Sequence, residues 1–397
     1  MRNLLTNIGK KSKKAFLKKL SSNKKDKVLK DYYLLITKNK KLIINENKKD
    51  IKNAYKKKIK DNLVQRLILN NKKILEITNS IKKIIRLKDP TNIVLEKWKR
   101  PNGLVISKVS IPLGVIGIIY ESRPNVTADV ASLCFKSGNT VILKGGSEAY
   151  YSNLILSKLF RKSLKKNGVD ENFVQFLSIK KRSVVDFLLT KMSKFIDVII
   201  PRGGKSLVKK VQKLSSIPTI GHLEGVCHSY IDKSANAKIA NKIIQNAKLR
   251  NTAICGATET ILLHEKIIKK FGNEILKNLE KNGCKIIADN KIRKLYNKKI
   301  QKATIKDWSK EYLSSIVSVK SVKNIDEAIH HINKYGTMHT DCIITQNKKA
   351  AKKFLNEVKS SIAMHNTSTQ FADGGEFGFG GEVGISTNTL PPRGPVG

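Results

Sequence analysis

Acidic residues and arginine are both scarce in this 397-residue chain. Asp and Glu together number 31 against 78 Lys and Arg, which leaves a formal net charge of +47. Only 11 of the 78 basic residues are Arg, so 67 are Lys. Arginine is the preferred residue for bidentate contacts with phosphates and bases, so a surface selected for nucleic acid would contain more of it. The shortage favours drift in composition over specific nucleic-acid binding, with weak polyanion binding as a consequence.

Cysteines are few, and their spacing excludes two further classes of protein. The five form an odd, scattered set with no CxxC pair, and no histidine lies at metal-ligand spacing from two of them. A disulfide framework is therefore not expected, and neither is a zinc site or any other metal. Reduced thiols in a cytoplasmic protein fit this pattern better. The five are Cys134, Cys227, Cys255, Cys284 and Cys342.

Long apolar runs are also missing. The longest, such as residues 111–120, are far shorter than the roughly 20 residues that cross a bilayer, so no membrane partner is expected. The basic N-terminus lacks the apolar core of a secretory signal. A hydrophobic content of 40% and 24 glycines are ordinary for a globular enzyme, and the length suggests about two or three packed domains.

Lysine, the most conspicuous residue, is unevenly distributed. The first 60 residues hold 20 lysines, whereas four later stretches hold none. The strong bias toward lysine is absent from those four stretches, so we look for catalytic and binding residues there. They are residues 111–135, 217–232, 251–265 and everything after Lys359.

The N-terminal region reads as helices followed by a hairpin. Apolar residues recur at helical spacing through 12–88, with 51–69 and 72–87 as two of the expected helices. At 93–112 the composition becomes β-rich around Asn102-Gly103. A type I′ turn needs positive φ at both central residues, which this dipeptide tolerates, so we expect a hairpin arm over about 95–112.

From residue 113 the pattern alternates strand and helix. Such βαβ alternation predicts a doubly wound sheet with right-handed crossovers, whose ligands lie beyond the carboxyl ends of the strands. Three polar, glycine-containing or proline-containing turns fall there, at 121–125, 145–149 and 201–204. The expected strands are 113–120, 140–144, 173–178 and 196–200, and the expected helices are 126–137, 149–168, 182–192 and 204–215.

A second α/β segment follows from about residue 226 to residue 385. It ends in a glycine-rich stretch, 373–384. Neither an internal repeat nor a long linker is evident. The expected elements are helix 235–249, helix 265–282, strand 284–288, helix 325–335, strand 341–345 and helix 347–358.

Cys255 is the best candidate nucleophile. It lies between the polar pair Asn251-Thr252 and the small pair Gly256-Ala257, before a strand resumes. In a tight turn with small neighbours, backbone N–H groups can lower the pKa of a thiol and hold an oxyanion. The alternative is ordinary packing, because cysteine is among the most buried residue types. The other four cysteines sit in apolar runs, where packing is the better interpretation.

The turns after the strands offer binding groups of lower specificity. None matches GxGxxG or GxxxxGK[ST], so neither common nucleotide motif is present. Lys144 and the small residues after it could meet a phosphate or ribose, or form a simple loop with Ser147 as N-cap. Arg123 can clamp a carboxylate or phosphate, and the Asn125 amide can donate to an oxyanion. His222 lacks a third ligand for a metal, so a substrate contact or buried role is expected.

Several long segments of the chain resemble the γ-glutamyl phosphate reductase family, a branch of the aldehyde dehydrogenase superfamily. The resemblance covers essentially the whole chain and extends to 47-NKKD-50 and 62-NLVQRL-67 in the N-terminal helices. The other segments that carry it are 112–149 with ESRPN, 222-HLEGVCH-228, 252-TAICGATETILL-263, 311-EYL-313 and 361–387 with FADGGEFGFG.

The resemblance implies an α/β, aldehyde dehydrogenase-like fold. It consists of a Rossmann-type cofactor domain, an α/β catalytic domain and the β-hairpin as an oligomerisation arm. The implied boundaries are 1–221 for the N-terminal helices and NADP-binding domain, 222–385 for the catalytic domain and 386–397 for a tail. The family continues beyond the 393-RGPVG-397 motif for about another strand, so we expect an under-paired hairpin edge and a weakened homo-oligomer.

The resemblance also assigns roles to single residues. Cys255 matches the nucleophile and Asn125 the oxyanion-hole asparagine. His222 falls where hydrolytic relatives have a general-base Glu, and with Arg123 and Asn366 it is an expected substrate contact. The expected cofactor contacts are Lys144, Ser147 and Glu148 near the ribose, Gly203 and Gly204 near the pyrophosphate, and Glu311 as the second ribose contact.

The implied reaction is the NADPH-dependent reduction of L-glutamyl 5-phosphate to L-glutamate 5-semialdehyde in proline biosynthesis. It proceeds through a thioester on Cys255 and releases phosphate, and it suggests functional coupling to glutamate 5-kinase. Gly221 and Glu224 around HLEG, and Ser314-Ser315 after Glu311, depart from the family pattern. Two alternatives stay open: another acyl-phosphate or aldehyde dehydrogenase of the superfamily, and a degenerate polyanion-binding remnant.

Overall fold

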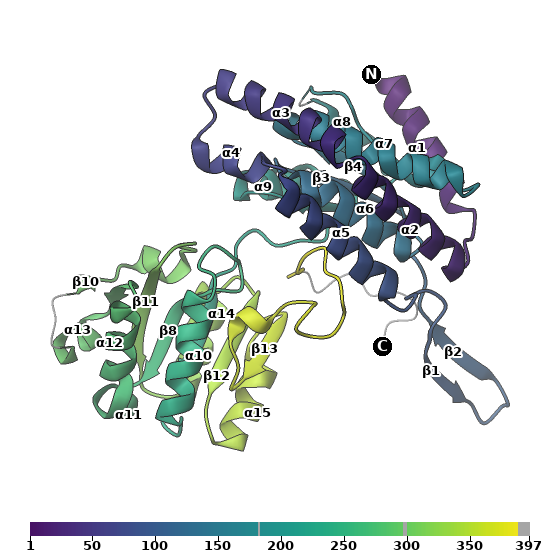
Figure 1. Cartoon of the computed structure of the whole chain (residues 1–397). Helices are drawn as coiled ribbons and strands as arrows, with labels where there is room; N and C mark the ends of the chain where they lie inside the picture. The colour runs from purple at the N-terminus through teal and green to yellow at the C-terminus, as the bar shows by residue number, and fades with distance from the viewer. Residues whose placement is uncertain (182, 297–299, 388–397) are drawn as a thin grey trace. The chain divides into compact units, whose positions relative to one another are not determined.

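The computed structural model describes residues 1–181, 183–296 and 300–387, with only the backbone of residue 62. The chain divides into two compact units, Met1–Gly221 and His222–Gly397. Figure 1 labels most of the helices and strands of both units. Most of the expected tail, 386–397, lies outside the described residues. No helix in the described part of the chain is long and apolar enough to span a membrane.

The first unit begins with five helices. The expected helix 51–69 is wrong, because the chain breaks there into two. Lys58 has φ +52° and the N–H of Ile59 bonds to the carbonyl of Ala54, which is a Schellman ending. The sequence did not predict this helix end, because lysine occupies the position that usually holds glycine. The helices are α1 (Arg2–Phe16), α2 (Ser22–Lys38), α3 (Lys40–Lys56), α4 (Asp61–Leu67) and α5 (Asn71–Arg86).

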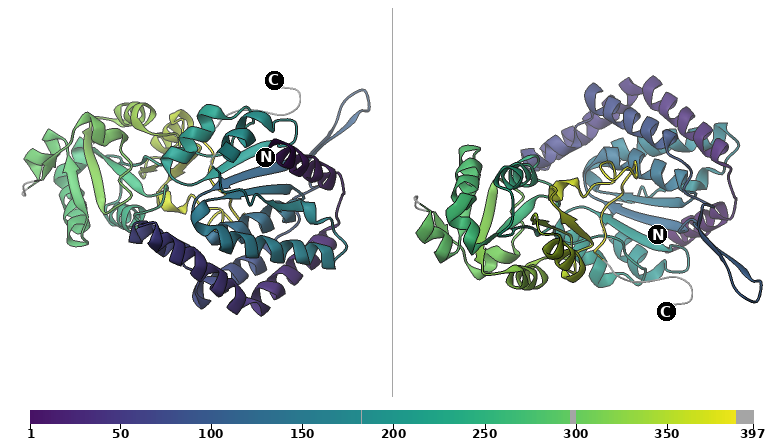
Figure 2. Two further views of the ribbon diagram at one scale, coloured as in Figure 1. Left: turned by 90° about the horizontal axis from the view of Figure 1, so that it is seen from above. Right: turned by 90° about the horizontal axis from the view of Figure 1, so that it is seen from below.

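A four-stranded parallel sheet forms the centre of the first unit. Its order is β5-β4-β3-β6, so the strand order reverses beside β3. Helices α6 and α7 contact one face, and an apolar cluster joins α1, α8 and α9 to the other; Figure 2 shows the sheet between these layers. The elements are β3 (Val115–Tyr120), α6 (Pro124–Lys136), β4 (Thr140–Gly145), α7 (Tyr150–Lys166), β5 (Val174–Phe176), α8 (Ser183–Lys191), β6 (Val198–Arg202) and α9 (Lys205–Leu214).

The predicted hairpin is present as β1 (Val94–Lys99) and β2 (Val105–Val109). Its turn is not type I′, because Gly103 has positive φ and Asn102 does not. The N–H of Gly103 bonds instead to the carbonyl of Arg100. Pro101 is restricted to φ near −65°, which suits the second position of an ordinary turn, so the turn starts one residue earlier than Asn-Gly suggested.

The second unit is built on a seven-stranded parallel sheet of order β10-β9-β11-β8-β7-β12-β13. Apolar clusters join one face to α10 and α12 and the other to α14 and α15. The strands are β7 (Cys227–Ile231), β8 (Thr258–His264), β9 (Lys285–Ala288), β10 (Gln301–Lys302), β11 (Ile316–Val322), β12 (Thr340–Ile344) and β13 (Ile362–His365). The helices are α10 (Ala237–Leu249), α11 (Glu265–Ile267), α12 (Asn273–Lys281), α13 (Asn290–Leu295), α14 (Ile325–Tyr335) and α15 (Lys348–Glu357).

Several elements of the second unit were not predicted. Strands β7, β10, β11 and β13 and helix α13 were missed. Strand β7 is short and mixed in polarity, and it begins inside a motif interpreted only as a site. The expected helix 265–282 is interrupted by a π-helical stretch, Ile268–Gly272, between α11 and α12.

Candidate active site

Cys255 lies in the loop 250–257 between α10 and β8. It is the only one of the five cysteines, all of them in the described residues, that is partly exposed. Burial raises the pKa of Cys134 and Cys342 to about 12 and that of Cys284 to about 11. Burial also raises the pKa of Cys227. The other four thiols are therefore held in their unreactive form.

The segment 222–226 packs directly on the backbone of Cys255. A Cβ added to Gly225 would lie 2.1 Å from the Cys255 carbonyl oxygen. The Cys227 thiol donates to the same oxygen at 3.1 Å. Glu311 accepts the N–H of Gly225 at 2.9 Å, so in the second unit this expected ribose contact also fixes the segment beside the nucleophile.

A buried ion pair holds the two ends of the Cys255 loop. Lys248 near the end of α10 and Glu259 in β8 meet at 2.6 Å, and both side chains are 0% exposed. Burial raises the pKa of Glu259 to about 7, against the opposing effect of Lys248. Glu259 also accepts the N–H of Leu313 at 3.2 Å. The pair thereby ties the loop to the segment that carries Glu311.

Two histidines lie beside Cys255. The ring centroids of His222 and His339 are 4.6 Å apart, and one ligand atom of each lies within 4.8 Å of the others and of the Cys255 sulfur. His222 Nδ1 lies 2.8 Å from the carbonyl oxygen of Ile385, which makes this nitrogen the donor. Burial lowers the pKa of His339 to about 3, with the nearby His222 acting in the same direction. Sequence reasoning missed His339, although residues 335–347 also lack lysine.

Asn366 is engaged in backbone contacts. Its side-chain oxygen accepts the N–H of Thr345, and its side-chain nitrogen donates to the Thr345 carbonyl, both at 2.9 Å. With φ at +53°, Asn366 ends β13 in the left-handed region that asparagine tolerates. These bonds favour a role in joining the ends of β12 and β13 over the substrate contact expected from the sequence.

In the first unit, the turns after β3 and β6 meet where the strand order reverses, the usual ligand position in such sheets. The Glu121 carboxylate accepts the N–H of Gly204 at 2.8 Å, at the start of α9. A Cβ on Gly203 would lie 2.6 Å from the same carboxylate. The two expected pyrophosphate glycines thus already contact a negatively charged group.

The end of β4 and the turn after it carry three further expected cofactor residues. Lys144 is buried and donates to the Gly145 carbonyl at 2.9 Å, and burial lowers the pKa of Lys144. Glu148 accepts from Ser147 at 3.0 Å and from Ser122 at 3.1 Å. The structure therefore gathers Lys144, Ser147 and Glu148 beyond one strand end.

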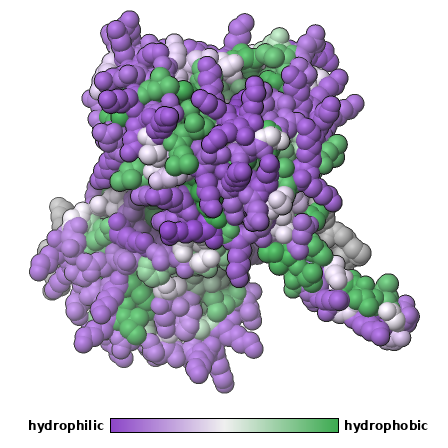
Figure 3. Space-filling view, turned by 45° about the vertical axis from the view of Figure 1, so that its right-hand side comes forward, coloured by the Kyte–Doolittle hydropathy of each residue, from purple (hydrophilic) through white to green (hydrophobic). Residues whose placement is uncertain are grey.

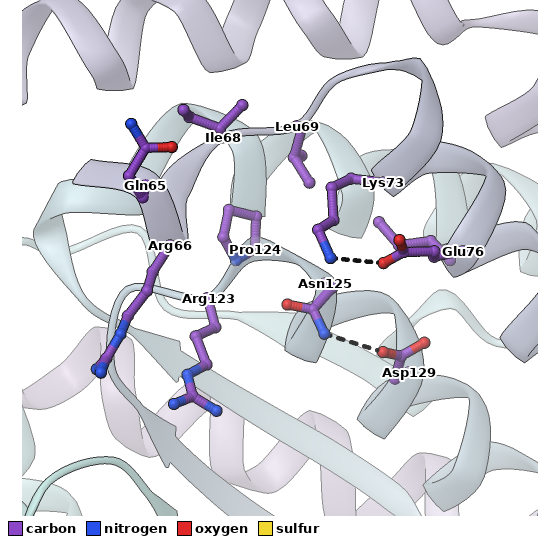
Figure 4. A pocket seen from close by; sticks show the side chains of 11 residues that line it. Gln65, Arg66, Ile68, Leu69, Lys73, Glu76, Arg123, Pro124, Asn125 and Asp129 are labelled. Atoms are coloured by element: carbon purple, nitrogen blue, oxygen red, sulfur yellow. Dashed lines mark hydrogen bonds and ion pairs between the residues drawn. The ribbon is translucent and has the colours of Figure 1, made fainter. Parts of the chain in front are cut away.

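Arg123 and Asn125 line a pocket of about 460 Å³ formed by α4, α5 and the start of α6. Figure 4 shows Arg66 and Arg123 on one side of it and Lys73 paired with Glu76 on the other. Burial lowers the pKa of Arg123, and Arg66 lies close enough to lower it further. Arg66 lies in the family-like segment 62-NLVQRL-67, but nothing in the sequence indicated that it lines the same pocket as Arg123.

Asp129 also lines this pocket and contacts Asn125. The Asn125 amide donates to Asp129 Oδ2 at 3.3 Å, and Oδ1 is buried with no partner among the described residues. Burial raises the pKa of Asp129 to about 6. Nothing in the sequence indicated this role, because Asp129 has the pattern of a residue on the polar face of a helix.

A family model described as the aldehyde dehydrogenase family matches residues 6–291 and 301–386. A γ-glutamyl phosphate reductase from Bartonella tribocorum is 47% identical over 335 residues, which are 84% of this chain and 81% of the relative. The chain belongs to the γ-glutamyl phosphate reductases within the aldehyde dehydrogenase family. It is therefore an oxidoreductase, as the resemblance implied.

Further comparisons agree with this family. The γ-glutamyl phosphate reductase of Rhodospirillum rubrum is 47% identical over 337 residues, covering 85% of this chain and 78% of the relative. The solved γ-glutamyl phosphate reductase of Thermotoga maritima has a TM-score of 0.94 at 40% identity, covering 99% of this chain and 95% of that one. An acetylating aldehyde dehydrogenase from Geobacillus thermoglucosidasius, at 17% identity and TM-score 0.64, covers 94% of this chain and 88% of that one and shares the fold alone.

Proposed function

We propose that this protein reduces L-glutamyl 5-phosphate to L-glutamate 5-semialdehyde through a thioester on Cys255. The similarity to proteins named γ-glutamyl phosphate reductase supports the identity of the substrate. The partial exposure of Cys255, alone among the cysteines, supports the nucleophile. The thiolate attacks the acyl carbonyl, inorganic phosphate leaves with the electrons of the broken C–O bond, and the acyl group stays on sulfur.

Asn125 is the proposed oxyanion donor of the first unit. The Asn125 amide already donates to a carboxylate oxygen of Asp129, so it presents N–H groups to a negative oxygen. Donors preorganised in this way are worth roughly 2.7–4 kcal/mol each in acyl transfer.

His222 occupies the position where hydrolytic relatives have a general-base Glu, and the proposed reaction does not need a general base there. Its Nδ1 is held by the Ile385 carbonyl, which fixes the ring beside Cys255. Phosphate departs from the acyl phosphate as a good leaving group, and no water has to be activated against the thioester. We therefore assign His222 to substrate contact rather than to hydrolysis.

The turns of the first unit fit a nicotinamide dinucleotide. The Gly204 N–H already takes a carboxylate oxygen, and the start of a helix favours such anions. Gly203 and Gly204 would hold the pyrophosphate, and Lys144, Ser147, Glu148 and Glu311 would contact ribose. When bound, this group supplies the hydride that reduces the thioester. An engineered glycolyl-CoA reductase that shares the fold at 16% identity has been solved with bound NADP⁺. We propose NADPH for this chain.

The pocket beside Asn125 is the proposed site for the charged end of the substrate. Arg66 and Arg123 lie close enough to lower the Arg123 pKa, and a carboxylate or phosphate between two guanidinium groups would relieve that repulsion. The glutamyl part of the substrate carries such a carboxylate.

The remaining context is proposed from the family. Proline biosynthesis, coupling to glutamate 5-kinase and a cytoplasmic location are proposed from the resemblance. Self-association through the hairpin is supported by its exposed apolar side chains, visible at its tip and base in Figure 3. Leu95, Val105 and Ile111 are each more than half exposed.

One assay separates this function from that of another aldehyde dehydrogenase. Purified protein is given glutamate 5-semialdehyde and NADP⁺ with and without inorganic phosphate, and absorbance of the reduced cofactor is followed. Phosphate-dependent reduction of NADP⁺ is expected, with propionaldehyde and acetaldehyde as poor substrates. Equal rates without phosphate, or with the simple aldehydes, would contradict the proposal.

A further inference from the structure

The residues around the Cys255 sulfur form a potential metal-ligand set, and the proposed reaction does not require a metal. His222, Cys255 and His339 each place one potential ligand atom within 4.8 Å of the other two. They come from three separate segments: the start of the second unit, the loop before β8 and the residue before β12. Only the tertiary structure supplies the third ligand that His222 lacks in the sequence.

Hydrogen bonds at Nδ1 already orient both histidine rings. His222 Nδ1 donates to the carbonyl of Ile385 at 2.8 Å. His339 Nδ1 lies 3.0 Å from the hydroxyl of Thr340 and 3.6 Å from the sulfur of Cys227. A metal-ligating histidine usually has its second ring nitrogen bonded to a carbonyl or similar group, so both rings are oriented as such ligands are.

The remaining nitrogen of His339 is a buried polar atom without a partner. The side chain is 0% exposed, and its Nε2 has no hydrogen-bond partner among the described residues. Leaving a buried polar group unpaired costs free energy, because the group has lost its water and gained no partner. A ligand that accepts electrons from this nitrogen would recover that cost.

The chemistry of the three ligands selects a class of metal. One thiolate and two imidazoles suit Zn²⁺ and neighbouring transition metals, whereas Mg²⁺ and Ca²⁺ prefer oxygen. Zinc–sulfur and zinc–nitrogen bonds of about 2.3 and 2.0–2.1 Å put tetrahedral ligand atoms roughly 3.5 Å apart. The three atoms must close by about 1 Å, which the half-buried His222 and Cys255 leave room for.

We propose that His222, Cys255 and His339 bind one Zn²⁺ ion, with the fourth position open to water or inorganic phosphate. The Cys255 thiol loses its proton to solvent as the zinc–sulfur bond forms. The binding rests on the geometry of the second unit alone. Its consequence, reversible inhibition, rests on the proposed function, because zinc would occupy the electron pair that attacks the substrate.

Cobalt(II) binding to the resting, full-length protein tests the site without reference to activity. Protein freed of metal by a chelator is titrated with Co²⁺, and the thiolate-to-cobalt charge-transfer band is followed. Zn²⁺ is then added to displace the cobalt. We expect one Co²⁺ per chain, loss of the band in Cys255→Ala, and an affinity at least about tenfold lower in His339→Gln.

Two further variants complete the experiment. His222→Gln changes a half-buried side chain, and its affinity should fall as for His339→Gln, so the test survives if the buried variant fails to fold. His330→Gln replaces an exposed histidine outside the cluster and should bind cobalt like the original protein. Absence of the band, or equal affinity in His222→Gln, would refute the site whatever the enzyme's activity. Co²⁺ binding as expected, in a protein without reductase activity, would contradict only the proposed function.

Discussion

Cys255 is distinguished from the other cysteines by exposure and by its neighbours. Replacing it with alanine removes the proposed nucleophile, and turnover should fall by at least about 10³-fold, as for other covalent catalysts. Phosphate-dependent NADP⁺ reduction measures this. Cys284→Ser alters a buried thiol outside the site and is the matched control. Substantial activity in Cys255→Ala would show that another group attacks the substrate.

Arg123 and Arg66 define the proposed anion pocket. Arg123→Ala removes a charged donor, and the loss of about 1.5–3 kcal/mol should raise KM for the semialdehyde roughly 10–100-fold. Steady-state kinetics at saturating NADP⁺ and phosphate measure the change. Arg86→Ala, at an exposed position near the end of α5, should leave KM unchanged. An unchanged KM in Arg123→Ala would place the substrate elsewhere.

Asp129 makes stability depend on pH. Its pKa is about 6 in the folded protein and 3.8 when unperturbed, so folding favours the protonated form. Its stabilising contribution is complete below pH 3.8 and disappears as the pH rises through 6. Asp129→Asn should therefore raise the free energy of unfolding by about 1–2 kcal/mol at pH 7.5, allowing for partial exposure of the side chain. The gain should vanish near pH 4.

Urea unfolding at the two pH values measures this difference. The conservative variant keeps a hydrogen-bonding partner for Asn125. Destabilisation at pH 7.5 would mean that the charged carboxylate is favoured in the folded protein.

At the scale of elements, the loop 250–257 depends on the segment 222–226 beneath it. A Cβ on Gly225 would lie 2.1 Å from the backbone oxygen of Cys255, which cannot yield as a flexible side chain can. Gly225→Ala should displace the loop and reduce kcat by about 10²-fold or more, because an error near 1 Å in a reacting group costs that much.

Gly221→Ala is the matched control, since its Cβ would meet Pro201 at an ordinary 3.4 Å. Circular dichroism establishes that both variants are folded, and stopped or continuous assays give kcat. Full activity in Gly225→Ala would show that the loop tolerates the shift.

The elements were predicted best where the hydrophobic pattern is local. Helix α14 and strands β3 and β4 lie close to their predicted bounds, because burial imposes a clear period on their sequences. The π-helical stretch and the turn at Pro101 were not, because each depends on backbone geometry that several sequences can adopt. The break at Lys58 belongs with them, as a non-glycine residue with positive φ.

At the scale of the whole molecule, the charge of +47 is a source of self-repulsion. Like charges destabilise the compact state, and salt screens them over a length that falls from about 30 Å at 0.01 M to 8 Å at 0.15 M. The melting temperature should therefore rise by several degrees between these ionic strengths in NaCl. Differential scanning fluorimetry without phosphate or cofactor measures it. A falling melting temperature would show that attractive ion pairs dominate.

The sequence by itself determined the family and, through the family motifs, the candidate site residues. Asn125, His222, Cys255 and the glycine-rich stretch 373–384 lie in the lysine-free stretches. Their motifs led to the family, because a reaction constrains residue types over short distances along the chain. Only the tertiary structure brought His339 to Cys255, Arg66 to Arg123 and Glu121 to Gly204. These pairs are separated by tens of residues, and their contacts are fixed by how strands and helices pack, which no local pattern records.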